Sequence, residues 1–241
     1  MRTAADTLDG MTSVAERASQ VRDRIDAACR AAGRQPAEVR LMAVTKTHEL
    51  DVLEQAYAAD LRLFGENRVT EAADKAEQLA DRADLAWALI GHLQTNKVAK
   101  ALRFTTELHT LDSLRLAEAL DRRLQEQGRG LDVFVQVNTS GEPAKTGLAP
   151  EEVESFVLDL RPFTALNVRG LMTLAVFSDD ETAVAACFDR LAELQCRLRQ
   201  LDGAPGSYDE LSMGMSGDFE LAIAHGATTV RVGQTLFGAR V

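Results

Sequence analysis

A lysine stands at the end of one short apolar segment, where its amine could act as a nucleophile. Lys46 closely follows the run 41–44 in the sequence LMAVTKTHEL, just before a helix-like stretch. An amine placed where a buried strand opens into a loop can lose its proton through desolvation and attack a carbonyl group. Most lysines are instead solvated surface charges. Lys46 alone does not decide between these interpretations.

A second polar segment, SMGMSGD at 212–218, could hold a phosphate group. It carries two serines and two glycines before a helix that we expect to begin near Gly217. Backbone N–H groups at that helix start, with a hydroxyl from Ser212 or Ser216, would suit a phosphate dianion. The structural alternative is that Ser216 is a helix N-cap and that the glycines only form a turn.

An arginine lies inside the apolar segment TTVRVG. Arg231 would be buried there if both faces of the sheet are covered, and a buried guanidinium needs an acceptor because it does not deprotonate. A salt bridge to one of the 37 acidic residues is the alternative. Asn67 and Asn96 each follow an apolar segment and could line a pocket or cap a helix.

A lysine, a phosphate cradle and a buried arginine together suggest pyridoxal 5′-phosphate (PLP). The aldehyde of PLP forms a Schiff base with lysine, its phosphate needs an anchor, and its ring nitrogen needs a defined partner. An arginine beside that nitrogen would keep it unprotonated and weaken the ring as an electron sink. The three cysteines and four histidines are dispersed along the chain, so we expect neither a metal centre nor disulfides.

Strand-like and helix-like segments that could position these residues alternate along the chain. A first helix is expected at about 12–31, followed by strands at 40–44, 61–64, 85–90, 107–110, 132–138, 168–174, 210–213 and 229–232, with amphipathic helices between most of them. This alternation predicts one α/β domain over 1–241, a single-domain (β/α)8 TIM barrel with an extra N-terminal helix. An open doubly wound sheet is the alternative. Active sites of such barrels lie at the carboxyl ends of the strands, where all the residues above are expected.

Composition and charge restrict the function classes. The chain of 241 residues is 46% hydrophobic and 27% charged, which is ordinary for a soluble globular protein. Its net charge of −10 argues against nucleic-acid binding. The N-terminus lacks the apolar region of a secretory signal, and the apolar runs are too short to cross a membrane. We therefore expect a cytoplasmic monomer without nucleic-acid or membrane partners.

Eight collinear motifs make the chain resemble the pyridoxal phosphate homeostasis protein family, formerly described as proline-synthase co-transcribed proteins. The resemblance extends from about Val14 to Arg240. The motifs are AVTKTH (43–48), FGENRVTEA (64–72), IGHLQTNK (90–97), HTLDS (109–113), VQVNTSGEPAKTG (135–147), RGLMTL (169–174), LSMGMSGDFELAI (211–223) and VRVGQTLFGAR (230–240).

The resemblance implies a fold like the N-terminal domain of alanine racemase, PLP fold type III. It implies Lys46 as the Schiff-base lysine and Arg231 as the partner of the pyridine nitrogen. The other cofactor-binding residues it implies are Ser212, Gly233 and the backbone of Gln234 at the phosphate, with Asn67 and Asn96 lining the pocket. Gln234 stands where the family usually has a small hydroxyl residue, although its amide can also donate to phosphate. Lys145 matches a family lysine that could be a secondary aldehyde acceptor or simply a solvated side chain.

Three functions fit these residues. The first is a non-catalytic protein of intracellular PLP (vitamin B6) homeostasis, which holds PLP and could deliver it to PLP-dependent apo-enzymes. The second is a PLP enzyme such as an amino-acid racemase or decarboxylase, and the third is a Schiff-base aldolase. Racemases of the related fold add a second domain and a catalytic tyrosine, whereas this chain ends at Val241 and has only Tyr57 and Tyr208. We therefore expect the first function, with no catalytic residue.

Overall fold

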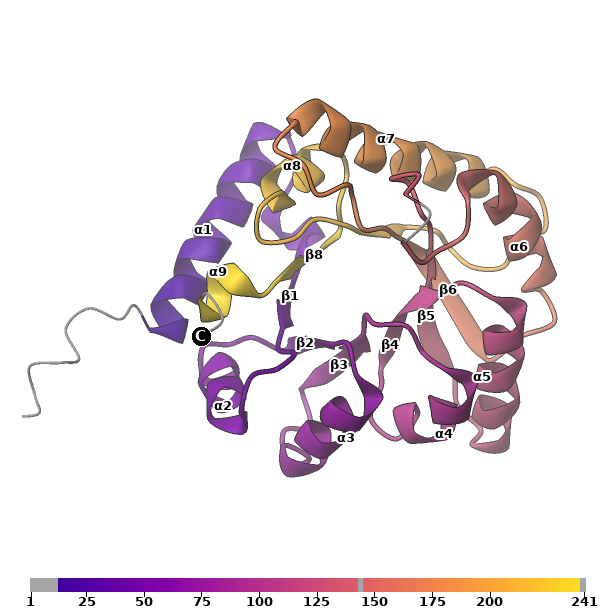
Figure 1. Cartoon of the computed structure of the whole chain (residues 1–241), viewed down its shortest axis with the longest axis horizontal. Coiled ribbons are helices and arrows are strands. Elements are labelled where there is room, and N and C mark those ends of the chain that lie inside the picture. The colour runs from indigo at the N-terminus through magenta and orange to yellow at the C-terminus, as the bar shows by residue number, and fades with distance from the viewer. Residues whose placement is uncertain (1–12, 143–144, 239–241) are drawn as a thin grey trace, which may run out of the picture.

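The chain folds into a closed barrel of parallel strands surrounded by helices (Figure 1). The computed structural model describes residues 13–142 and 145–238, and eight strands lie in this part of the chain. They are β1 (Arg40–Val44), β2 (Leu63–Glu66), β3 (Ala86–Leu89), β4 (Glu107–Leu111), β5 (Leu131–Gln136), β6 (Leu166–Met172), β7 (Glu210–Ser212) and β8 (Thr229–Val232). Each strand pairs with the next, and β8 pairs with β1. The predicted barrel is confirmed, and the open sheet is excluded.

Helices follow the strands and cover the outside of the barrel (Figure 1). The described α-helices are α1 (Val14–Ala31), α2 (Leu50–Ala58), α3 (Val69–Gln78), α4 (Val98–Ala101), α5 (Leu114–Glu126), α6 (Val153–Asp159), α7 (Glu181–Leu198), α8 (Phe219–Ala224) and α9 (Gln234–Phe237). Short 3-10 turns η1 (Pro36–Glu38), η2 (Thr95–Lys97) and η3 (Pro150–Glu152) lie between them. No helix in the described ranges is long and apolar enough to cross a membrane.

The strand boundaries show where local bonding ends an element. Strands 40–44 and 229–232 form as predicted, whereas the other six predicted ranges differ at one or both ends. The strand expected at 61–64 begins at Leu63, because the Leu61 N–H closes the end of α2 by donating to the Ala56 carbonyl oxygen at 3.1 Å. The strand expected at 132–138 ends at Gln136, beyond which Val137 forms only an isolated bridge to Leu148.

The extra N-terminal helix is present as α1, which lies outside β1 and β8 beside α8 and α9 (Figure 1). It begins at Val14 with Ser13 as its N-cap. The Ser13 hydroxyl accepts from the Glu16 N–H, and the Glu16 carboxylate accepts from the Ser13 N–H at 2.7 Å, a capping box. The predicted helix start at 12, residues 143 and 144 of the PAKTG segment, and residues 239–241 lie outside the described residues.

The interior of the barrel is apolar on one side and polar on the other. Met42, Leu63 and Ala88 form an apolar cluster inside β1 to β3, separate from the main core between strands and helices. Gly65 makes room for it, because a Cβ there would lie 2.7 Å from the Met42 sulfur. Buried polar side chains, among them His109, Ser212 and Arg231, come from β4, β7 and β8, and Phe134 of β5 stacks on His109.

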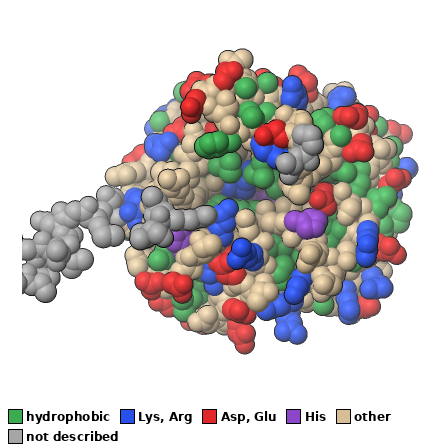
Figure 2. Space-filling view, in the orientation of Figure 1, with side chains coloured by type: hydrophobic (Ala, Val, Ile, Leu, Met, Phe, Trp, Pro, Cys, Tyr) green, Lys and Arg blue, Asp and Glu red, His purple; other side chains and the backbone are tan. Residues whose placement is uncertain are grey.

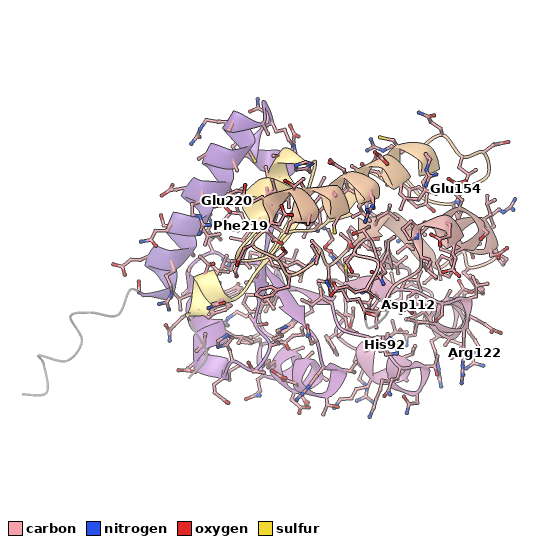
Figure 3. All side chains as sticks on the ribbon, turned by 45° about the horizontal axis from the view of Figure 1, so that its top comes forward. His92, Asp112, Arg122, Glu154, Phe219 and Glu220 are labelled. Carbon is pink, nitrogen blue, oxygen red and sulfur yellow. The ribbon has the colours of Figure 1, made fainter. Side chains whose placement is uncertain are left out.

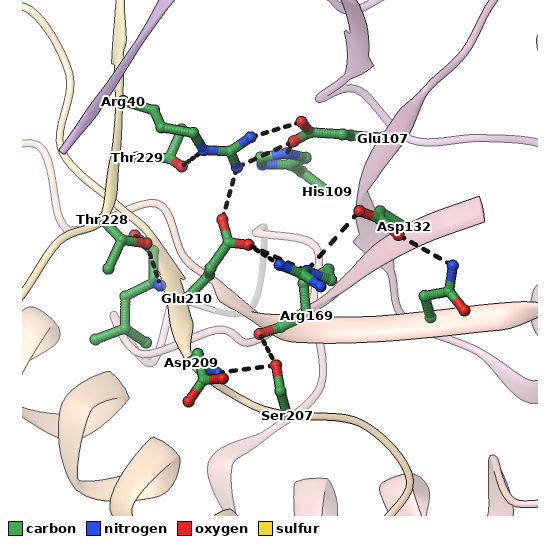
Figure 4. A network of polar contacts seen from close by, with 12 residues as sticks. Arg40, Glu107, His109, Asp132, Arg169, Ser207, Asp209, Glu210, Thr228 and Thr229 are labelled. Atoms are coloured by element: carbon green, nitrogen blue, oxygen red, sulfur yellow. Dashed lines mark hydrogen bonds and ion pairs between the residues drawn. The ribbon is translucent and has the colours of Figure 1, made fainter. Parts of the chain in front are cut away.

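A network of charged side chains ties the strands together at their amino ends (Figure 4). Arg40 donates to Glu107 at 2.6 Å and to Glu210 at 2.7 Å. Arg169 donates to Glu210 at 3.1 Å and lies 3.8 Å from Asp132. Burial raises the pKa of Glu107, but hydrogen bonds from His109 and Arg40 outweigh it and lower that pKa to about 2. Glu107 is therefore an anion at neutral pH.

Strands β6 and β7 approach each other closely, which leads to a first prediction. A Cβ on Gly170 would lie 1.7 Å from the backbone oxygen of Glu210. Gly170→Ala must separate the strands, and we expect a loss of about 3 kcal/mol in the free energy of unfolding. Urea denaturation measures it. Gly217→Ala is the matched control, because a Cβ there meets no atom within 4 Å. Equal stability of the two variants would contradict the prediction.

Candidate functional site

The carboxyl ends of the strands open into a hollow near the centre of one face, with basic side chains inside it (Figure 2). Lys46 follows β1, and its side chain is half-buried. Asn67 follows β2 and is also half-buried, whereas Asn96 lies in η2 and is exposed. Neither asparagine is the N-cap of a described helix. The capping alternative is therefore wrong for both residues.

The pairing of β1 with β8 places Lys46 close to the turn at Gly233. Met42 is in register with Arg231, and Ala43 with Val232. At the next position a Cβ on Gly233 would lie only 3.3 Å from the backbone oxygen of Val44. The turn after β8 therefore packs directly against the end of β1, two residues before Lys46.

A buried lysine that the sequence analysis missed fixes the backbone beside Lys46. Lys75 of α3 donates from Nζ to the Thr45 carbonyl oxygen at 2.8 Å, to Glu66 at 2.8 Å and to Glu71 at 2.7 Å. Glu71 also accepts from the Thr47 N–H at 2.5 Å. Thr47 has a φ of 66°, a left-handed conformation that is costly for a β-branched residue. One cluster of charged side chains, Lys75 with Glu66 and Glu71, thus holds the backbone on both sides of Lys46.

The sequence contained a sign of this arrangement. Lys75 falls on the buried face of α3, three positions after Ala72 and six after Val69. Burial raises the pKa of its partner Glu66, although the hydrogen bonds from Lys75 and Thr45 oppose this change. One oxygen of Glu66, Oε2, is buried without a hydrogen-bond partner among the described residues. A lysine on an apolar helix face predicts such a buried carboxylate partner.

The loop after β7 and the turn after β8 meet at Ser216. Its Oγ accepts from the Gly233 N–H at 3.3 Å and from the Thr235 N–H at 3.4 Å. The helix expected near Gly217 is α8, which begins at Phe219 with Asp218 as its N-cap. The proposed capping role of Ser216 is therefore wrong. A half-buried hydroxyl and two backbone N–H groups converge here, a combination that suits an oxyanion.

The other serine of this loop points to the barrel interior. Ser212 is fully buried, and its Oγ lies 2.8 Å from Arg231 Nη1 and 2.9 Å from His109 Nδ1. The two serines of SMGMSGD thus face different surroundings. Ser212 already has two polar neighbours beneath the mouth, whereas Ser216 lies at its rim.

Arg231 is buried without an ionic partner among the described residues. Its side chain donates to Ser212 and, from Nη2, to the Thr173 carbonyl oxygen at 2.7 Å. No ion pair to a described carboxylate forms, so the predicted salt-bridge alternative is wrong. Burial lowers the pKa of Arg231 to about 10, with Asp218 opposing the change. A cation remains at the floor of the mouth, where it can meet a hydrogen-bond acceptor of a ligand.

Other polar groups stand around the mouth. His92 and Asp112 come from the loops after β3 and β4, with 3.8 Å between Nδ1 and Oδ2 (Figure 3). Lys145 donates to the Ala175 carbonyl oxygen at 2.9 Å and forms an ion pair with Glu142. The described residues include no group of three or more His, Cys, Asp or Glu side chains arranged for a metal ion.

Known proteins resemble the chain over nearly all its length. The sequence family described as alanine racemase, N-terminal domain, matches residues 17–241. The pyridoxal phosphate homeostasis protein of Pseudomonas aeruginosa is 41% identical over 95% of this chain and 97% of its own. The structure of PipY from Synechococcus elongatus with PLP bound is similar with a TM-score of 0.82 and 37% identity, covering 93% of this chain and all of that chain. An alanine racemase from Clostridium difficile shares the fold at 15% identity, with a TM-score of 0.68 over 93% of this chain and 56% of its own.

The buried pair at α3 leads to a prediction with a defined pH dependence. Lys75→Met leaves Glu66 without its cation, and we expect a loss of about 3 kcal/mol in the free energy of unfolding at pH 8. The raised pKa of Glu66 should rise further, so the folded variant binds a proton more tightly than its unfolded chain does. The loss in the free energy of unfolding, relative to the unchanged protein, should therefore shrink as the pH falls to 5.5.

Lys100→Met is the control, because Lys100 forms an exposed pair with Asp74 at 3.5 Å. We expect its effect to stay below about 1 kcal/mol. Urea denaturation at both pH values measures the two variants. A deficit of Lys75→Met that is constant or grows toward low pH would contradict the assignment.

Proposed function

The chain belongs to the pyridoxal phosphate homeostasis protein family, and we propose that it binds PLP in the mouth of its barrel and takes part in the homeostasis of this cofactor. The observation that carries the proposal is Arg231, a buried cation without an ion pair among the described residues. It lies on β8, whose carboxyl end packs against the end of β1 before Lys46. PLP needs a partner for its ring nitrogen and a lysine for its aldehyde, and these two strands provide both.

Arg231 is the proposed partner of the ring nitrogen. Its guanidinium can only donate hydrogen bonds, so it binds the nitrogen in its unprotonated form. Protonation of that nitrogen beside a buried cation is unfavourable. A ring held in this way accepts electrons poorly, which supports holding of the cofactor rather than catalysis on it.

Ser216 is the proposed hydroxyl at the phosphate, in place of Ser212. Ser216 lies at the rim with the backbone N–H groups of Gly233 and Thr235, whereas Ser212 is bonded to Arg231 and His109 below. The backbone of Gln234 stays a predicted phosphate contact from the same turn. The exposed Gln234 side chain is not needed for this role.

Lys46 is the proposed Schiff-base lysine. Its unprotonated amine forms a C=N bond with the aldehyde carbon, and the aldehyde oxygen leaves as water. Asn67 remains the proposed pocket residue beside it. The loop after β3 packs tightly there, because a Cβ on Gly91 would lie 2.2 Å from the Asn67 backbone oxygen. The predicted role of Asn96 requires a contact from the exposed turn η2.

The positions of the tyrosines support a non-catalytic role. The chain has two tyrosines, and both lie in the described part. Tyr57 donates to Asp84 at 2.5 Å near the amino end of β3, and Tyr208 is buried before the amino end of β7. Neither can serve as an acid or base at the mouth. The cytoplasmic location, the monomeric state and the delivery of PLP to apo-enzymes stay predictions.

Lys46→Ala tests the covalent link. The protein reconstituted with PLP should absorb in the visible range as a pyridoxal Schiff base, and borohydride should fix the label on Lys46. The variant should lose this absorbance, remain folded by circular dichroism, and retain weaker PLP binding through the phosphate. Lys97→Ala, in η2 of the loop after β3, is the control. A label on Lys145, or unchanged absorbance of Lys46→Ala, would refute the assignment.

Ser216→Ala tests the phosphate contact. We expect PLP to bind about tenfold more weakly, because one hydrogen bond to a charged group is lost. Pyridoxal, which has no phosphate, should bind the variant as it binds the unchanged protein. Ser207→Ala, a serine before the amino end of β7, should change neither affinity. Equal weakening for both ligands would place Ser216 elsewhere in the site.

Catalysis is tested separately by racemisation and decarboxylation assays with alanine and other amino acids. We expect no substantial turnover by the PLP-loaded protein. The reason is the combination of an arginine at the ring nitrogen and the absence of a tyrosine near the mouth among the described residues. Turnover that exceeds the rate of PLP in solution by orders of magnitude would favour the enzyme alternative.

A further inference from the structure

A chain of buried polar side chains crosses the interior of the barrel beneath Arg231. Arg231 Nη1 lies 2.8 Å from Ser212 Oγ, which lies 2.9 Å from His109 Nδ1. His109 Nε2 lies 2.9 Å from Glu107, and Glu107 is bound by Arg40 at the amino end of the barrel. We propose that His109 is a positioning residue, which holds Arg231 at the floor of the mouth through Ser212 and is itself held by Glu107.

Elementary donor and acceptor rules allow one arrangement of the hydrogens in this series of hydrogen bonds, with donors and acceptors alternating from Arg231 to Glu107. A guanidinium can only donate, so Ser212 Oγ accepts from Arg231, and its single hydroxyl hydrogen must point elsewhere. At the other end Glu107 is ionised and can only accept, so His109 Nε2 carries a hydrogen. Nδ1 of a neutral imidazole then accepts from the Ser212 hydroxyl. Every hydrogen bond from Arg231 to Glu107 is satisfied in this one arrangement.

The charge state of His109 agrees with this direction. The ring is fully buried and stacks on Phe134 with 4.0 Å between the ring centroids. Burial lowers the pKa of His109; Glu107 opposes this change, and the nearby charge of Arg231 adds to it. A protonated His109 would donate from Nδ1 to Ser212 as well. The serine would then accept from two donors, and its own hydrogen would have no partner in the chain.

Glu107, the last acceptor in this series of hydrogen bonds, is fixed to the strands rather than to a mobile loop. Arg40 joins Glu107 of β4 to Glu210 of β7 and donates to Thr229 of β8 at 3.2 Å (Figure 4). The position of Arg231 is therefore defined by the barrel wall through three hydrogen bonds in series. The consequence for the cofactor rests on the proposed function: His109 sets how well Arg231 meets the ring nitrogen, without touching the ligand.

The direction of the chain can be tested in the protein without ligand. Nitrogen-15 NMR of the imidazole rings distinguishes the two neutral tautomers from the charged form. We expect one neutral histidine protonated at Nε2 at pH 7, and its resonance should be absent in His109→Phe. A charged ring, or a proton on Nδ1, would overturn the proposal whether or not the protein binds PLP.

The positioning role can be tested by comparing PLP with an analogue that has C–H in place of the ring nitrogen. Both ligands carry an aldehyde and a phosphate, so a change of their affinity ratio between variants reports the contact to the nitrogen. We expect a ratio of about tenfold for the unchanged protein, and of about one for Arg231→Met. His109→Phe and Ser212→Ala should both bring the ratio to within about twofold of that of Arg231→Met.

Met42→Leu is the control, because Met42 is in register with Arg231 on the apolar side of the interior. It should keep the tenfold ratio. If His109→Phe does not fold, Ser212→Ala and the tautomer of the unchanged protein still decide the question. A normal ratio in a folded Ser212→Ala variant would refute the positioning role. If the unchanged protein itself binds no PLP, the proposed function fails. The tautomer of His109 then still tests the arrangement of the hydrogen bonds from Arg231 to Glu107.

Discussion

The interior of the barrel is organised by the need to bury one permanent positive charge. Arg231 cannot lose its proton at neutral pH and forms no ion pair with a carboxylate of the described residues. Two of its donors bond to a hydroxyl and a carbonyl oxygen, from Ser212 and Thr173. These acceptors, and the imidazole behind one of them, require polar side chains on β4 and β7. The apolar cluster of Met42, Leu63 and Ala88 lies on the side of β1 to β3.

The charged groups of the protein serve geometry more than stability. Replacing a buried ion pair with apolar side chains is often neutral or stabilising, so such pairs are weak evidence for a stability role. Here the Lys75 cluster fixes Thr45 and, through Glu71, Thr47 around Lys46. The Arg40 cluster fixes the strands from which His109 and Ser212 extend. Two separate networks thus define the positions of Lys46 and Arg231. We assign these residues to the aldehyde and to the ring nitrogen of one ligand.

Much of the fold could be predicted from the sequence, because the alternation of apolar segments and amphipathic helices depends on local composition. The burial of Arg231 also followed from its place in an apolar strand. The roles of Ser212 and Ser216 could not be separated in this way, because they lie four residues apart in one loop. Only the hydrogen bonds of the folded chain show that Ser212, at the end of β7, points inward to Arg231 and His109. Lys75 was missed although it falls on the buried face of α3, because two of its three partners, Thr45 and Glu66, meet it only in the folded chain.

The seam between β7 and β8 is paired at a single registered position, Ser212 with Thr229. The side-chain hydrogen bond from Arg231 to Ser212 crosses this seam, beside backbone hydrogen bonds from Met213 to Thr229 and from Arg231 to Gly214. A ligand that binds Arg231 in the folded chain stabilises that state, so that occupancy of the mouth and resistance to proteolysis rise together. The lifetime of the folded chain becomes a measure of the ligand available to it.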